Sequence, residues 1–289
     1  MLIGAHVSVA GGYQNGLEYG ASVGAECIQF FAKSPRQWKG PAINPAASLA
    51  FAEQRERMNL GPAFTHTAYL LNLSTVDELL LEKTVLALAD ELTRAGLLGV
   101  DGVVTHVGTD PAGDESAAAM RAAAVIRAAY VLAGDVAANT RLLLENTAGG
   151  GSTFGCTFSQ LASVVTCCGM PSTQLGICLD TCHAFAYGMP LDSAEGWRGV
   201  LHEIDSTVGL QRLGLIHAND CMFARGSRRD RHAWIGDGFI GNEGFSAMVC
   251  APELIGVPCV VEMPGEKPHK DIVNLDRLKS LRNECAQSH

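Results

Sequence analysis

Residues 141–145, Arg-Leu-Leu-Leu-Glu, form a short apolar run that ends on a carboxylate, and seven similar runs occur along the chain. Each run has the length of a β-strand and is bounded by residues typical of turns, which predicts a buried strand. The eight predicted strands are Leu2–His6, Cys27–Phe31, Ala63–His66, Gly102–His106, Arg141–Glu145, Leu175–Asp180, Leu213–His217 and Pro258–Glu262.

Helical patterns lie between several of these runs. Ser74 and Asp77 form a capping-box pattern that predicts the start of a helix, and Gly96 is a natural stop for the same helix. Further helices are predicted over about 115–133, ended by Gly134, over about 193–208 and over about 270–282.

The alternation of strand and helix patterns in a chain of 289 residues predicts an α/β fold. We expect one domain, residues 1–289, folded as a single (β/α)8 TIM barrel with the active site at the C-terminal rim of the strands. An open, doubly wound sheet is the alternative, although the sequence has no G-x-G-x-x-G phosphate turn to support it.

The composition is that of a globular protein, since 47% of residues are hydrophobic and 18% are charged. The sequence shows neither a signal-peptide pattern nor about 18 uninterrupted apolar residues, so we expect a cytoplasmic protein without a membrane span. The ten cysteines lack the paired C-x-x-C pattern of a zinc site and are predicted to be reduced. A net charge of −9 weakly disfavours a nucleic-acid partner, but three divalent ions would bring it to −3.

Each of the last six runs ends on a side chain that can bind a metal ion. These residues are His66, His106, Glu145, Asp180, His217 and Glu262, at intervals of 40, 39, 35, 37 and 45 residues. A barrel gathers the C-terminal ends of its strands on one rim, so the six are expected to converge there. A single histidine at a strand end is more often structural, whereas an isolated carboxylate there is costly to bury unless it is paired or metal-bound.

Three more candidates follow in the loops. His183 comes three residues after Asp180, and Asp230 and His232 form a D-x-H step that is a weak signal by itself. Nine ligands are too many for one ion, and imidazole plus carboxylate without thiolate favours zinc, with manganese and iron left open. Such a multinuclear centre suits phosphodiester hydrolysis, because one ion pair can generate hydroxide while another ion stabilises the departing alkoxide.

Eight segments, in order from residue 3 onward, carry a family resemblance. They are Ile3–Ser8, Lys33–Trp38, His66–Asn72, Leu144–Gly149, Leu179–Phe185, His217–Asp220, Gly226–His232 and Gly236–Gly241. Together they resemble endonuclease IV, and the resemblance extends to about residue 265. It implies a TIM barrel that cleaves duplex DNA 5′ to an abasic site, leaving a 3′-hydroxyl and a 5′-deoxyribose phosphate, and that also trims blocked 3′ ends.

The resemblance also implies three zinc ions and assigns their ligands by position. His66, His106 and Glu145 resemble the ligands of one zinc, and His183, Asp230 and His232 those of another. The remaining zinc would be held by Glu145 as a bridge, with Asp180, His217 and Glu262. Glu145 and Glu262 would be catalytic because they orient the attacking hydroxide. The resemblance further suggests a monomer, cytoplasmic and associated with the nucleoid in its function.

The predicted DNA contacts come from two parts of the chain. Arg36, Tyr69 and Leu70 match residues that the family inserts at the lesion, where an abasic sugar is cheap to flip because it has no base to unstack. Ordinary packing is the alternative for Tyr69 and Leu70. The segment 225–232 has four arginines and one aspartate, and Arg225, Arg228 and Arg229 are predicted to grip phosphates. A solvated loop is the alternative there.

Two positions depart from the family pattern. Val107 stands where the family usually has proline, and Met263 where it usually has threonine, which leaves the ligands intact but puts fine geometry in doubt. The competing enzyme function is a metal-dependent sugar isomerase or epimerase on the same barrel, whose sites are richer in carboxylates and poorer in histidine. A damage-binding protein that does not cut DNA is the non-catalytic alternative.

Overall fold

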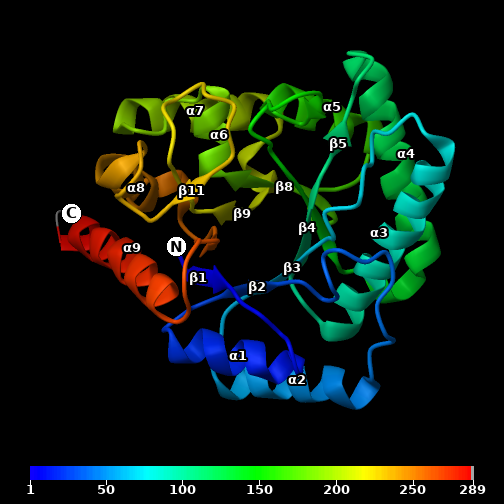
Figure 1. The fold of residues 1–289 in the computed structure, drawn as a ribbon, viewed down its shortest axis with the longest axis horizontal. Coiled ribbons are helices and arrows are strands. Elements are labelled where there is room, and N and C mark those ends of the chain that lie inside the picture. Colours follow the sequence, from blue (N-terminus) through cyan, green and yellow to red (C-terminus); the bar gives the residue numbers. More distant parts are fainter. Residues whose placement is uncertain (288–289) are drawn as a thin grey trace.

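The structure of the protein, a computed structural model, describes residues 1–287, and its centre is a closed barrel of parallel strands (Figure 1). Around the barrel the order is β1 (Ile3–His6), β12 (Cys259–Val261), β9 (Leu213–His217), β8 (Leu175–Asp180), β6 (Arg141–Glu145), β4 (Gly102–His106), β3 (Ala63–His66) and β2 (Ile28–Phe30). Because β1 pairs with both β2 and β12, the sheet closes on itself. The predicted (β/α)8 barrel is therefore confirmed, and the alternative of an open sheet is wrong.

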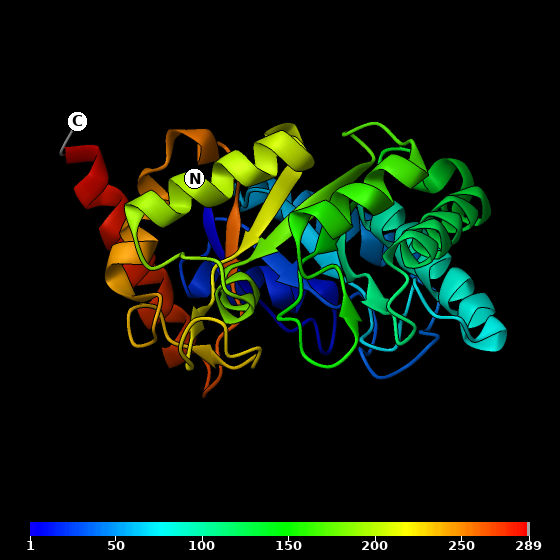
Figure 2. The same cartoon turned by 90° about the horizontal axis from the view of Figure 1, so that it is seen from above.

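Helices form the outer layer, and most of them follow a strand (Figure 1). They are α1 (Tyr13–Ser22), α2 (Pro45–Arg57), α3 (Glu78–Leu98), α4 (Glu115–Ala133), α5 (Phe158–Cys168), α6 (Thr181–Tyr187), α7 (Ala194–Thr207), α8 (Gly241–Cys250) and α9 (His269–Gln287). Seen at right angles, the loop after β6 and the loops around β10 (Asp220–Cys221) and β11 (His232–Ala233) project on one side of the molecule (Figure 2). That side carries the candidate site.

The predicted ends of α3 are wrong at both termini. The helix begins at Glu78, with the Asp77 carboxylate accepting a hydrogen bond from the backbone N–H of Leu80. Ser74 lies outside the helix and donates its hydroxyl to the carbonyl of Thr109. Gly96 lies inside α3, at a point where an added Cβ would come within 1.9 Å of the Val136 carbonyl oxygen. The glycine permits close packing, and Gly99, at φ +63°, ends the helix instead.

The other predicted helices are confirmed in position. α4 has the expected bounds, and α7 starts after a Ser193 cap. α9 is longer at both ends than the predicted 270–282. By length and composition alone residues 115–137 could cross a membrane, but α4 packs between α3 and α5 with five of its alanines buried. The apolar character of α4 is accounted for by this packing.

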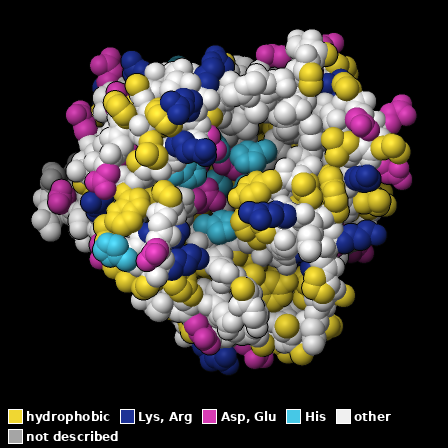
Figure 3. Space-filling model, in the orientation of Figure 1, with side chains coloured by type: hydrophobic (Ala, Val, Ile, Leu, Met, Phe, Trp, Pro, Cys, Tyr) yellow, Lys and Arg dark blue, Asp and Glu magenta, His cyan; other side chains and the backbone are white. Residues whose placement is uncertain are grey.

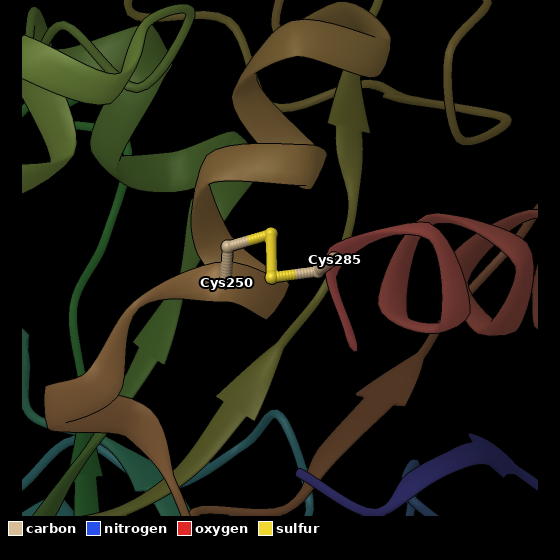
Figure 4. The surroundings of a disulfide bond; sticks show 2 residues. All are labelled: Cys250 and Cys285. Carbon is tan, nitrogen blue, oxygen red and sulfur yellow. A yellow bond between two sulfur atoms is a disulfide. The ribbon is translucent and has the colours of Figure 1, made fainter. Parts of the chain in front are cut away.

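Two cysteines correct the prediction of an all-reduced set. Cys250 at the end of α8 and Cys285 in α9 form a disulfide, with their Cα atoms 5.7 Å apart (Figure 4). The two helices lie side by side, so residues 35 apart in the sequence become neighbours. The other eight cysteines are free, and of these only Cys167 is exposed.

Alternate residues of each strand point into the barrel, as the period of a β-strand requires. One interior layer is a buried apolar cluster of Cys27, Phe64, Val104, Leu143, Cys178, Leu215 and Val260. The residues two positions further along, together with His6 two residues after Gly4 in β1, form a polar layer above it. This rim layer consists of His6, Gln29, His66, His106, Glu145, Asp180, His217 and Glu262.

We predict that Gly4→Ala destabilises the protein by about 3 kcal/mol, the upper end of the range for overpacked cores. An added Cβ would lie 1.8 Å from the carbonyl oxygen of Cys27 in the neighbouring strand. Urea unfolding measures the change. Gly199→Ala is the control, because Gly199 lies in α7 with nothing within 4 Å of the new methyl group, and a gain of roughly 0.5–1 kcal/mol is expected. Equal effects of the two variants would contradict the close packing at Gly4.

Candidate metal centre

The nine predicted ligands lie together at the C-terminal rim of the barrel. Histidines and acidic side chains line a hollow at the centre of this face, with lysines and arginines around it (Figure 3). Within each of three groups the potential ligand atoms all lie within 4.8 Å of one another. The groups are His66, His106 and Glu145; Glu145, Asp180, His217 and Glu262; and His183, Asp230 and His232. The structure thus brings the predicted ligands together, while their roles as ligands stay predictions.

Glu145 belongs to two of the groups and is almost completely buried, with 1% of its surface exposed. Its Oε2 atom lies 3.1 Å from Nε2 of His66 and 3.5 Å from Nε2 of His106. Its Oε1 atom lies 3.0 Å from Nδ1 of His217. Because each carboxylate oxygen faces a different group, the geometry of Glu145 suits a bridge between two ions.

Asp180 and Glu262 face the same nitrogen from two sides. Nδ1 of His217 lies 3.4 Å from Oε2 of Glu262 and 3.9 Å from Oδ2 of Asp180. Oδ1 of Asp180 caps α6 by accepting the backbone N–H of His183, so helix capping fixes the carboxylate and leaves Oδ2 toward the group. Asn219 donates its amide to this Oδ2 at 2.7 Å and accepts the backbone N–H of Glu262.

The third group is built by the loop after β9. Pairing of β10 with β11 places His232 opposite Cys221 and turns the loop back toward the rim. Asp230 lies between two histidines, with Oδ2 3.2 Å from Nε2 of His183 and Oδ1 3.3 Å from Nε2 of His232. The D-x-H step therefore aims both of its side chains at one position, although Asp230 itself is exposed.

The charges of the site are strongly coupled. Burial opposes ionisation of Glu145, but the nearby imidazoles of His106 and His217 outweigh it and hold its pKa well below the usual range. Burial lowers the pKa of His106 to about 4. For His232 burial also opposes the charged form, yet Asp230 and Asp180 raise its pKa to about 9. The same balance, with Asp180 as the largest opposing influence, holds the pKa of His183 well above its usual value.

The donor set fits divalent ions. His66, His183 and His232 each place Nδ1 within 2.9 Å of a backbone carbonyl oxygen, which fixes the tautomer and leaves Nε2 for the group. Nε2 of His232 is buried and makes no hydrogen bond, as expected of a nitrogen whose natural partner is a metal. Mixed imidazole and carboxylate ligands are typical of zinc.

One thiol lies close enough to be counted with the ligands. Cys182 forms a further group with Asp180 and His232, which the sequence did not predict. A hydrogen bond to Cys221, together with burial, raises the pKa of the Cys182 thiol. The thiol also donates to the backbone carbonyl of Arg231 at 3.6 Å, so it has partners of its own within the protein.

Two rim loops carry the residues predicted to enter the DNA. Arg36 is exposed, and its loop is held by the buried Lys33, whose ammonium donates to Asp90 at 2.7 Å and to the carbonyl of Trp38. Tyr69 is 65% exposed, its ring 5.4 Å from that of Phe31, so ordinary packing does not account for it. Leu70 is half-buried and lines, with Tyr69, a cavity of about 500 Å³ that reaches His106 and His183.

The three predicted phosphate-gripping arginines differ in their surroundings. All are exposed. Arg228 lines the same 500 Å³ cavity, and its guanidinium lies over the ring of Tyr187 at 4.7 Å. Arg229 lies over Phe223, while Arg225 faces the carboxylate of Asp192 at 3.6 Å. Of the three, Arg228 is therefore the one that shares a cavity with candidate ligands, namely His106, His183 and Asp230.

Three polar residues of the site were not assigned a role from the sequence. His6 and Gln29 complete the rim layer, and Asn219 holds Asp180 and Glu262. The signal for His6 was its place at the end of the first predicted strand. The signal for Gln29 was its distance of two residues from the inward-facing Cys27. The only sequence signal for Asn219 was its nearness to His217.

The two departures from the family pattern, Val107 and Met263, are buried and are not among the ligand groups.

Comparisons with known proteins identify the broad class of fold to which the chain belongs. The family of xylose isomerase-like TIM barrels matches residues 17–283. A D-tagatose 3-epimerase-like protein has the same fold, with a TM-score of 0.74 at 20% identity over 100% of this chain and 99% of that one.

Similarity at the level of sequence is more specific. A protein of Chloroflexus aurantiacus named "Probable endonuclease 4" is 41% identical over 281 residues, 96% of this chain and 97% of its own length. Endonuclease IV from Thermus thermophilus superposes with a TM-score of 0.85 at 38% identity, over 98% of this chain and 100% of that one. The chain belongs to the endonuclease IV family, and the predicted resemblance is confirmed.

We predict that zinc binding to the metal-free protein releases protons at neutral pH. The pKa values of His183 and His232 are raised, so both imidazoles are protonated at pH 7 and must lose a proton before a nitrogen can bind. Zinc affinity should therefore increase with pH, and the part of the increase that comes from His232 should level off above its pKa of about 9. Calorimetry in buffers of different ionisation enthalpy measures the release, and zinc binding without proton exchange would contradict it.

Proposed function

We propose that this protein is a zinc-dependent endonuclease that cleaves duplex DNA 5′ to abasic sites, leaving a 3′-hydroxyl and a 5′-deoxyribose phosphate. The observation that carries the proposal is the meeting of three ligand groups around the shared carboxylate of Glu145 on an open barrel rim. Membership of the endonuclease IV family supports it. Trimming of blocked 3′ ends belongs to the same proposal, because it breaks the same kind of bond.

The proposed cofactor is three zinc ions, held by His66, His106, Glu145, Asp180, His183, His217, Asp230, His232 and Glu262. When bound, such ions activate water and stabilise the negative charge of the phosphate and the leaving oxygen. Glu262 is the residue placed to orient the attacking water. Its side chain is 22% exposed, and it lines a cavity of about 350 Å³ with Tyr69 and Lys267. Glu145 is buried, and its carboxylate belongs to two of the ligand groups and so links them.

The surroundings of the rim support a nucleic-acid substrate. Arg36 and Tyr69 project from neighbouring loops, which a hydrogen bond from the N–H of Tyr69 to the carbonyl of Pro35 joins. An exposed aromatic ring beside a cavity that reaches the metal ligands suits a sugar turned out of the duplex. Arg228 at the cavity wall and Arg225 and Arg229 on the same loop supply positive charge for phosphates.

A sugar epimerase is the competing function, because epimerase-like proteins share the fold at low identity. The donor set argues against it, since five histidines and four carboxylates make three groups here. A protein that binds damage without cutting would need only the arginines and the exposed tyrosine. It would not need the complete set of ligands. We further propose that the protein acts as a monomer in the cytoplasm, at the nucleoid.

The first test is incision of a labelled duplex that contains one synthetic abasic site. Metal-replete protein should cut once, 5′ to the lesion, and the activity should survive brief magnesium removal. It should disappear after zinc is stripped with a strong chelator and return when zinc is added back, because the ions supply both water activation and charge stabilisation. Metal analysis of the same sample should give about three zinc ions per chain. No cut by protein that contains its metals would refute the proposal, and turnover of a ketose would replace it with the epimerase.

Glu262→Gln should reduce kcat for abasic incision by about 10²–10³-fold, because an amide cannot orient and deprotonate water as a carboxylate does. The fold should be unchanged, as measured by circular dichroism and thermal melting. Glu266→Gln is the control, since Glu266 is exposed on the following loop and outside the ligand groups. Incision by Glu262→Gln at the rate of the control would exclude the proposed role of Glu262.

A further inference from the structure

Gln29 is a completely buried carboxamide in the rim layer, and neither the sequence analysis nor the proposed ligand set uses it. It lies in β2, two residues after the inward-facing Cys27, and reaches across the top of the barrel. Its oxygen lies 2.8 Å from Nε2 of His217, and its nitrogen lies 2.8 Å from Oε1 of Glu262. One uncharged side chain thus contacts two of the four residues of the central ligand group.

The chemistry of the partners fixes which way the amide faces. A carboxylate can only accept hydrogen bonds, so the NH2 group of Gln29 must face Glu262. The same NH2 group lies 2.9 Å from Nδ1 of His6, which offers a second acceptor. The carbonyl oxygen of Gln29 therefore faces His217, and Nε2 of His217 must carry the proton that it donates. The tautomer of His217 follows from this contact.

Among the histidines of the candidate ligand set, His217 differs in which ring nitrogen faces its ligand group. His66, His183 and His232 direct Nδ1 to backbone carbonyls and present Nε2 to their groups, and His106 presents Nε2 to Glu145. His217 is reversed, because its Nδ1 faces Glu145, Asp180 and Glu262. Its Nε2 points into the barrel, where Gln29 supplies the acceptor that carbonyl groups supply elsewhere.

For Glu262 the consequence is that its two carboxylate oxygens have different partners. Oε1 accepts from Gln29 and lies 3.2 Å from Nδ1 of His6, so it is held on the side away from the ligand group. Oε2 is left facing Nδ1 of His217 at 3.4 Å. The amide of Asn219 also donates to Oε2 at 3.3 Å, so loss of Gln29 would weaken the orientation of the carboxylate without abolishing it.

We propose that Gln29 is a positioning residue that turns Nδ1 of His217 and Oε2 of Glu262 toward the central ligand group, where they would hold a metal ion. The inference rests on the proposed function for its link to DNA incision, but the effect on metal binding stands by itself. Outer-shell partners of this kind typically change metal affinity or activity by about 10–100-fold. Gln29 acts through His217 and Glu262 and does not touch the substrate.

The test compares Gln29→Met, which keeps the size of the side chain but loses both hydrogen bonds, with Thr65→Val. Thr65 is equally buried, in the neighbouring strand β3, and its hydroxyl has no hydrogen-bond partner in the described chain. Zinc affinity is measured by competition with a chromophoric chelator, and the ligand field by the visible spectrum of the cobalt-substituted protein. Gln29→Met should bind at least one zinc ion about 10–100-fold less tightly, with an altered cobalt spectrum, while Thr65→Val matches the parent.

Steady-state incision adds a second readout. Gln29→Met should lose kcat by about 10–100-fold with KM for the abasic duplex within about twofold, since the DNA contacts are elsewhere. If Gln29→Met does not fold, Gln29→Glu replaces it. That variant keeps the acceptor for His217 but sets a second carboxylate against Glu262, so kcat should fall more than zinc affinity. Zinc affinity and cobalt spectra equal to those of Thr65→Val would overturn the inference. Parent protein that binds zinc but cuts no abasic DNA would refute the proposed function alone.

Discussion

The rest of the site depends on one buried anion, the carboxylate of Glu145. An isolated carboxylate with 1% of its surface exposed would be costly to bury. Here each of its oxygens faces imidazole nitrogens at 3.0–3.5 Å, and those imidazoles keep its pKa low. His183 and His232 in turn owe their raised pKa values to carboxylates, chiefly Asp180 for His183 and Asp230 for His232. Positive charge around Glu145 therefore offsets the cost of burying its carboxylate, and the metal ions proposed above would supply such charge.

Closure of the barrel is the constraint that lets these charges meet. Parallel strands in register place the third residue of β12 level with that of β1, and alternation sends every second side chain inward. The lower interior layer is apolar and completely buried apart from slight exposure of Phe64, so the candidate ligands all lie on one side of it, at the rim. The layer above it carries six of them, together with His6 and Gln29. The barrel interior thus changes from an apolar layer to a layer of candidate ligands within the last two residues of the strands.

Much of this arrangement was predictable, because it depends on local patterns. Eight apolar runs gave eight strands, and five of them have the predicted bounds without change, as in Arg141–Glu145. The bounds of α3 were not predictable in the same way. Gly96 looks like a stop in the sequence, but close contact with Val136 is what requires a glycine there. The Cys250–Cys285 disulfide also depends on two helices that the sequence does not show to be neighbours.

The sequence by itself determined that metal-ligand side chains recur at strand ends, since strand period and unit length are properties of short segments. The sequence could therefore show that His66, Glu145 and Glu262 lie together at the C-terminal rim of the barrel. Only the tertiary structure decided which atom of each side chain faces which neighbour. Gln29 meets His217 and Glu262 across separations of 188 and 233 residues, and the contact exists only because the sheet closes. Tautomers and carboxylate orientations are set by such distant contacts, because hydrogen bonds act over about 3 Å and carry no trace in the local sequence.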